Sequence, residues 1–133
     1  MTPISKTPEL KKMIAIYIVA FIIMIIGFTI RVNIKWLDDE IQKADDERWF
    51  FGIKGVWGYI HLILYIILGY NCGLNLFPFA MTTSIVWETF EALVENATNG
   101  IIKTGGALDV SIDMTGYVIG SYWYLLKKRS IEK

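Results

Sequence analysis

Two long stretches of the chain contain no charged side chain, and they indicate where helices cross a membrane. The first, residues 13–30, has the length of one transmembrane helix, which needs about 20 apolar residues. The second, residues 55–87, is too long for a single helix. Residues typical of turns cluster near its middle, and they favour a tight turn between two helices. These turn residues are Gly69, Asn71, Gly73, Asn75 and Pro78.

Another apolar segment follows near the C-terminus. We therefore predict an all-α fold: an integral membrane bundle of four transmembrane helices, forming a single membrane domain over residues 1–133. The predicted helices cover about residues 13–31, 55–71, 76–96 and 106–126. The first apolar run is long for a signal peptide and has no small-residue cleavage site before Arg31, so we predict an uncleaved anchor.

The main polar segment, residues 31–54, lies between the first two predicted spans. Its apolar residues Trp36, Leu37 and Ile41 are separated by charges of both signs, and residues 49–51 are all aromatic. This pattern predicts an amphipathic helix at the membrane interface with an aromatic anchor after it. Two interpretations stay open: a solvated connector with mixed charges, or an acidic opening that concentrates cations above a buried site.

Composition supports a membrane protein. The 133 residues are 54% hydrophobic, and the mean hydropathy of +0.44 is high for a soluble domain. The formal net charge is zero, which gives no indication of a nucleic-acid partner. Membrane lipids are the expected partners, and a homo-oligomer stays open. Basic residues slightly favour cytoplasmic termini in a multi-pass arrangement. Cys72 is the only cysteine, which excludes an internal disulfide and a cysteine zinc site.

The third predicted span ends with three carboxylates on one face. Glu88, Glu91 and Glu95 are spaced i, i+3 and i+7. A charge at the centre of a membrane helix costs about 2.5–3.5 kcal/mol even on the mildest scale, so these acids must face protein, water or a cation. In the fourth span, Asp109 and Asp113 continue a stripe of small residues. Its glycines, Gly116 and Gly120, form a pattern that lets two helices approach closely, and we expect this approach to bring the two aspartates toward the acids of the third span.

The only histidine, His61, lies in the second span, and with the acids it predicts a metal site. Close carboxylates cannot all stay ionised without compensation, so they are protonated, pair with a base such as Lys103, or bind a cation. The excess of acid favours a divalent cation, with Mg, Mn or Zn as candidates for this ligand set. The predicted metal ligands are His61, Glu88, Glu91, Glu95, Asp109 and Asp113.

Within this set we expect different roles. Glu88, Glu91 and Asp113 are predicted inner ligands, and Glu95 and Asp109 outer ligands. The predicted catalytic residues are His61, as ligand or general acid/base, Glu88 and Asp113. Structural alternatives remain: a hydrogen-bonded histidine, Glu95 as a solvated helix end, and Asp109 as a helix cap.

Short motifs over residues 55–122 resemble the VanZ-like group and related small membrane proteins. They are Tyr59-Ile60-His61-Leu62, Trp87-Glu88-x-x-Glu91 with Glu95-Asn96, and Asp109-x-x-x-Asp113-x-x-Gly116-x-x-x-Gly120. The resemblance implies a helical membrane fold with a link to the cell envelope or lipid metabolism, and no established reaction. Related sequences often carry an arginine between the acidic helices, where this chain has only Lys103.

The leading functional hypothesis is a membrane protein whose carboxylate–histidine site binds a divalent cation and acts on a phosphate-bearing lipid or envelope intermediate. Such a protein would be a metal-dependent lipid phosphate hydrolase or transferase, in which the cation neutralises phosphate charge. Two alternatives stay open. One is a proton or cation transporter that uses the same acidic stripe, and the other is a non-catalytic membrane assembly factor.

Overall fold

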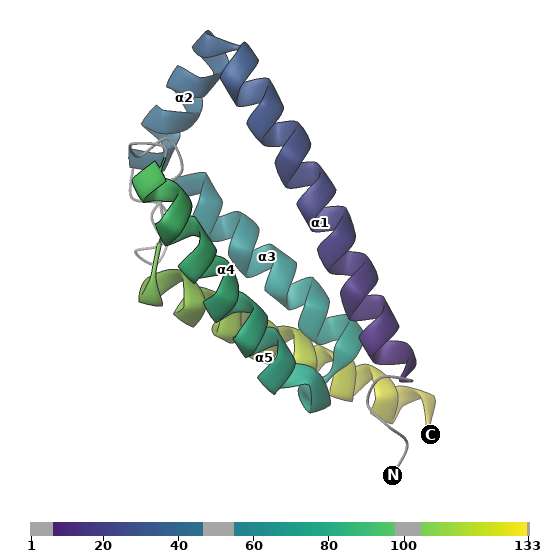
Figure 1. The fold of residues 1–133 in the computed structure, drawn as a ribbon. Helices are drawn as coiled ribbons and strands as arrows, with labels where there is room; N and C mark the ends of the chain where they lie inside the picture. Colours follow the sequence, from purple (N-terminus) through teal and green to yellow (C-terminus); the bar gives the residue numbers. More distant parts are fainter. Residues whose placement is uncertain (1–6, 47–54, 98–104, 133) are drawn as a thin grey trace. The chain divides into compact units, whose positions relative to one another are not determined.

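The computed structural model describes residues 7–46, 55–97 and 105–132, and in this part of the chain it is all-α (Figure 1). The described helices are α1 Pro8–Asn33, α2 Lys35–Asp46, α3 Gly55–Cys72, α4 Phe77–Ala97 and α5 Ala107–Ile131, with a short 3-10 helix, η3, at Leu74–Leu76. Each of the four predicted spans coincides with a helix, and α2 falls in the predicted amphipathic segment. The all-α prediction is confirmed.

Helix α1 is long and apolar enough to cross a membrane. Its 26 residues extend over about 39 Å at about 1.5 Å per residue, more than the roughly 30 Å of a bilayer core. Most of its large apolar side chains are exposed, as at Ile18 and Ile23. Helices α3 and α4 satisfy the same requirements of length and hydropathy only when they are taken together, and they are joined at a bend of 116°. By length and composition, one or two membrane-capable segments are therefore present in the described residues.

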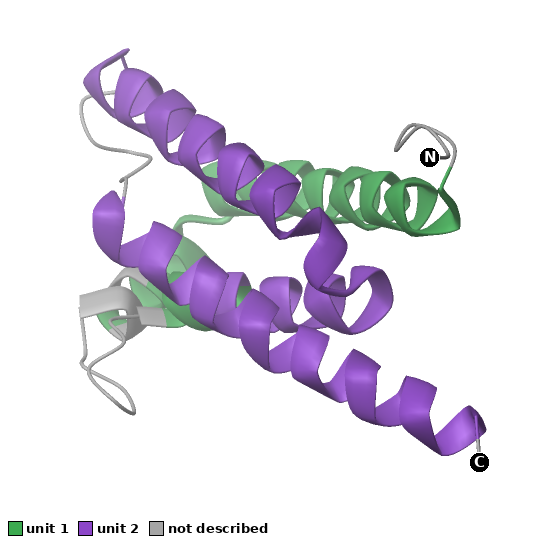
Figure 2. Ribbon diagram, turned by 90° about the horizontal axis from the view of Figure 1, so that it is seen from below, with its two compact units in different colours: residues 1–60 green, residues 61–133 purple. Residues whose placement is uncertain are grey.

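The chain divides into two compact units, residues 1–60 and residues 61–133 (Figure 2). In the first unit, α1 ends at Asn33 and α2 begins two residues later. Arg31 Nε donates a hydrogen bond to Asp38 Oδ1 at 2.7 Å and holds the two helices together at this corner. On α2, the hydrogen bond and the charge of Glu40 raise the pKa of Lys43 above its ordinary value. The predicted aromatic anchor at residues 49–51 lies outside the described residues.

In the second unit, a turn at Gly73 connects α3 to η3 and α4. Gly73 has φ +69°, a conformation that glycine adopts without steric cost. Its carbonyl accepts a buried hydrogen bond of 2.7 Å from the Tyr117 hydroxyl of α5. Pro78 lies in the first turn of α4, where its missing N–H costs nothing. The turn predicted from glycine, asparagine and proline is therefore present, and α5 anchors it.

Three glycines form a seam between α3 and α5. A Cβ at Gly116 would lie 2.7 Å from the Leu62 carbonyl oxygen, and one at Gly120 would overlap the Ile66 carbonyl. On the opposite side of the seam, a Cβ at Gly69 would overlap the backbone of α5. The backbones of the two helices are thus nearly in contact. The small-residue pattern predicted such a close approach toward the acids of the third span, whereas the glycines of α5 lie against α3. This close approach fixes which residues of α3 and α5 face each other.

Candidate metal centre

The buried polar side chains of residues 61–133 gather at one end of α3, α4 and α5. His61 lies in the first half of α3, Glu88 and Glu91 in the second half of α4, and Asp109 and Asp113 in the first third of α5. Because the chain reverses direction between α3 and α4 and again before α5, these portions meet at the end away from the Gly73 turn. All five side chains are buried, with exposed fractions between 1% for Asp113 and 7% for His61 and Asp109.

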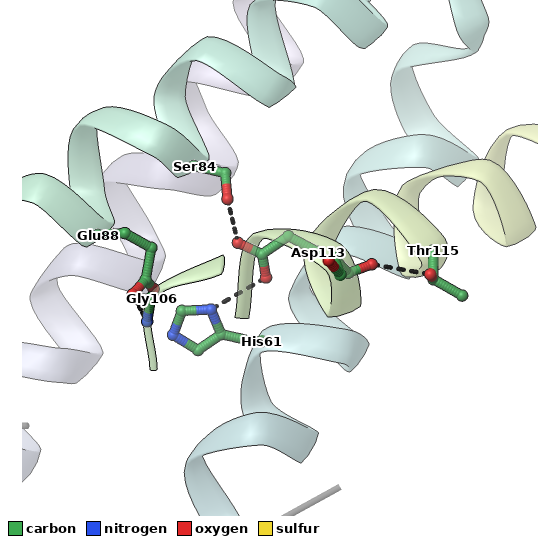
Figure 3. A network of polar contacts seen from close by, with 7 residues as sticks. His61, Ser84, Glu88, Gly106, Asp113 and Thr115 are labelled. Carbon is green, nitrogen blue, oxygen red and sulfur yellow. Dashed lines mark hydrogen bonds and ion pairs between the residues drawn. The ribbon is translucent and has the colours of Figure 1, made fainter. Parts of the chain in front are cut away.

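A chain of hydrogen bonds orients His61 (Figure 3). Its Nδ1 lies 2.9 Å from Asp113 Oδ1, and the other carboxylate oxygen accepts a 2.6 Å hydrogen bond from the Ser84 hydroxyl. An ionised carboxylate only accepts hydrogen bonds, so opposite an ionised Asp113 the proton is on Nδ1, and a neutral imidazole then has its lone pair on Nε2. The second ring nitrogen points toward Glu88 and Gly106. A carboxylate behind a histidine in this way fixes the tautomer and increases the basicity of a metal-binding imidazole.

The same geometry excludes one kind of catalysis. In a serine nucleophile arrangement the hydroxyl bonds to the imidazole, and the imidazole bonds to the carboxylate. Here Ser84 bonds to the carboxylate itself, on the oxygen that does not contact His61. Ser84 is therefore a support for Asp113 and is not activated by His61.

His61, Glu88 and Asp109 each offer one ligand atom, and these atoms all lie within 4.8 Å of one another. Bonds from zinc to nitrogen or oxygen ligands measure about 2.0–2.2 Å, so two ligands of one ion lie at most about 4.4 Å apart. The three ligand atoms are thus close enough together to be candidate ligands of one ion. One imidazole and two carboxylates suit Mn, Mg or Zn. The buried group could therefore hold a metal ion.

A pair of glycines brings the start of α5 against these acids. Gly106 has φ +60°, and its N–H donates a 2.7 Å hydrogen bond to Glu88 Oε2. A Cβ at Gly105 would overlap the Asp109 carboxylate. The backbone N–H groups at a helix start carry partial positive charge, which stabilises nearby carboxylates. The spacing of the acids does not predict this contact, although the Gly105-Gly106 pair before a helix is a usable signal for it.

The two remaining acids of α4 differ in environment. Glu91 is 98% buried and interacts electrostatically with Glu88, His61 and Asp109. Glu95 is only half-buried, close to the last residue of α4, and lies outside the group that His61 forms with Glu88 and Asp109. The assignment of Glu95 as an outer ligand stays a prediction.

The geometry also exchanges the expected positions of the two aspartates. We expected Asp113 among the inner ligands and Asp109 outside them. Instead, Asp109 shares the group with His61 and Glu88, and Asp113 supports His61 from behind. Spacing on α5 alone could not decide this, because both residues lie on the same helical face.

Little positive charge is available near the acids. In the described part of residues 61–133, the lysines and arginines are Lys127, Lys128 and Arg129, in the last turns of α5. Lys127 is 14 residues beyond Asp113, or about 21 Å along the helix, and its Nζ lies 5.2 Å from the centre of the Tyr70 ring. Lys103 lies outside the described residues. Among the described residues of this unit, His61 is thus the only base close to the acids.

Comparison with protein-family models, curated proteins and solved structures finds no match. The resemblance to the VanZ-like group stays a prediction.

Asn in place of Asp113 tests the orienting role of this carboxylate. We expect D113N to lower the affinity for Mn²⁺ by about 10–100-fold, because outer partners of metal-binding histidines have effects of this size. Ser84→Ala removes one hydrogen bond to Asp113 and should have a smaller effect. Mn²⁺ titration of the purified protein by calorimetry measures both. Ser130→Ala, at an exposed serine of α5, is the control. Unchanged affinity in D113N would contradict the role.

Proposed function

We propose that this chain is a multi-pass membrane protein that binds a divalent cation between His61, Glu88 and Asp109 and acts on a phosphate-bearing lipid. The distribution of side chains in the second unit supports membrane insertion. On α4, large apolar residues such as Val86 and Leu93 are exposed, whereas the carboxylates of Glu88 and Glu91 are buried. Water-soluble proteins have the opposite arrangement. Helices α3, α4 and α5 have 18, 21 and 25 residues, long enough for four spans together with α1.

The observation that carries the proposal is the buried group of His61, Glu88 and Asp109, with Asp113 behind the histidine. Burying carboxylates away from water costs several kcal/mol per charge unless a counter-charge compensates. The described residues of this unit provide no lysine or arginine at this end, and a cation is the simplest compensation. The acids sit near one end of the helices, which suits a site that opens at one membrane surface.

A cation bound by three protein groups keeps coordination positions open for other oxygen ligands. Phosphate oxygens are strong ligands for Mg²⁺ and Mn²⁺. At the depth of the helix ends, the available phosphates are those of lipid headgroups or lipid-linked intermediates. Bound there, the cation would neutralise the charge of the phosphate, and attack by water would be favoured.

Transport is the second candidate, and one observation favours it. Asp109, Asp113, Tyr117 and Ser121 recur every four residues on the buried face of α5, so polar groups continue beyond the acids. However, Tyr117 already donates to Gly73, and the ionisable groups remain at one end. A path for ions would need charged or hydrated positions over the full depth of the membrane, which makes the enzyme the better-supported proposal.

Reconstituted vesicles distinguish the two functions. The protein is placed in phosphatidylcholine vesicles containing phosphatidic acid as a lipid phosphate probe, with a Mn²⁺-quenched dye inside. We expect release of inorganic phosphate that depends on added Mn²⁺ and stops with a chelator, without dye quenching above that of protein-free vesicles. Quenching without phosphate release would support transport. If the purified protein binds no Mn²⁺, Mg²⁺ or Zn²⁺, the metal centre is wrong and an assembly role becomes the better hypothesis.

A further inference from the structure

The centre contains more negative charge than one divalent cation compensates. Glu88, Glu91, Asp109 and Asp113 are each at least 93% buried, and when all four are ionised they carry four formal negative charges. One divalent ion leaves two of these charges. A site with that excess would repel a phosphate group, which is itself an anion. If the proposed function is right, additional positive charge must enter the centre before or with the substrate.

The four carboxylates differ in the hydrogen bonds that they accept. Asp113 accepts hydrogen bonds from His61 and Ser84, and Glu88 accepts one from the Gly106 N–H. In Glu91, the carboxylate oxygen Oε2 is fully covered and has no hydrogen-bond donor among the described residues. A buried charged oxygen without a partner is costly, so this atom indicates a ligand.

Glu91 also occupies a suitable position for a second ion. It follows Glu88 by three residues on α4, so the two side chains share one helical face. Its electrostatic neighbours are Glu88, His61 and Asp109, which are the residues of the first group. Glu91 itself lies outside that group. It is therefore next to the first position without being one of its ligands.

We propose that Glu91 holds a second divalent cation beside the first, with Glu88 shared between them. This inference rests on the proposed function and specifies how the same site would receive phosphate. Two divalent ions bring the four carboxylates to neutrality. Paired ions about 3.5–4 Å apart are also a common device for phosphate chemistry, because they stabilise both the attacking and the leaving oxygen.

The reaction balances without a further co-reactant. A water oxygen forms a bond to phosphorus, and the bond between phosphorus and the lipid oxygen breaks with its electron pair moving to that oxygen. The lipid oxygen gains a proton and the attacking water loses one. The products are a lipid alcohol and inorganic phosphate.

Metal stoichiometry tests the proposal. The full-length protein in detergent is equilibrated with Mn²⁺, freed of unbound metal and analysed by mass spectrometry, and its electron paramagnetic resonance spectrum is recorded. We expect two equivalents and a spin-coupled signal in the wild type. Glu91→Gln should retain one equivalent and lose the coupling, which also shows that the first site is intact. Glu132→Gln, at an exposed residue after α5, should retain two.

The possible outcomes separate the two proposals. One equivalent in the wild type would overturn the second cation and leave the proposed function standing. Two equivalents in Glu91→Gln would overturn the assignment of Glu91. No bound metal in the wild type would overturn the second cation and the proposed function together.

Discussion

Replacing Glu88 by glutamine is expected to lower the affinity for Mn²⁺ by at least about 100-fold, the upper end of the effect of outer partners of a metal site. The amide oxygen of glutamine can still accept the hydrogen bond from the Gly106 N–H, so the start of α5 should keep its position. What the substitution removes is the charge that Glu88 contributes beside His61 and Asp109. Calorimetric titration with Mn²⁺ measures the loss.

Glu132→Gln is the matched control, because it makes the same chemical change at an exposed position. It should bind Mn²⁺ like the wild type. Thermal unfolding of the metal-free proteins should show E88Q to be at least as stable as the wild type, since the variant relieves repulsion among buried acids. If E88Q bound Mn²⁺ with wild-type affinity, a metal site on these residues would be untenable.

Most of the helical architecture could be predicted from the sequence because its physical cause is local. Charge-free runs define where a helix can lie in an apolar environment, and glycine and proline mark where it ends. The turn at Gly73 illustrates this, since its positive φ is a property of the residue itself. The N-terminal boundary of α1 was less predictable, because the helix begins at Pro8, several residues before the charge-free run.

The sequence could predict which residues belong to the candidate site. It could not predict which of them lie opposite one another. Spacing along one helix shows which residues share a face, so the buried group could be expected. Which residues meet across helices depends on how far one helix is shifted along the other. That shift is set by backbone contacts at the glycine seam, and it places Asp113 opposite His61. The Gly105-Gly106 contact with the acids depends on backbone conformation, which spacing does not contain.

Replacing Gly120 by leucine should therefore remove both the stability of the unit and the metal centre. A Cβ at this position already overlaps the Ile66 carbonyl and lies 2.7 Å from the Tyr70 backbone nitrogen. These are main-chain atoms of α3, which cannot rotate away as a side chain can. We expect destabilisation above about 3 kcal/mol, the upper end of ordinary overpacking. Thermal unfolding in detergent and Mn²⁺ titration measure the two effects.

The first unit offers the matched control, Gly27→Leu on α1, where a Cβ meets nothing within 4 Å. This variant should unfold at or above the wild-type temperature, because leucine favours the helical state more than glycine does. Gly120→Ala should fall between the wild type and Gly120→Leu, since it adds the Cβ alone. If Gly120→Leu retained wild-type stability, the backbones of α3 and α5 would not be in close contact. The register that brings His61 to Asp113 would then need another cause.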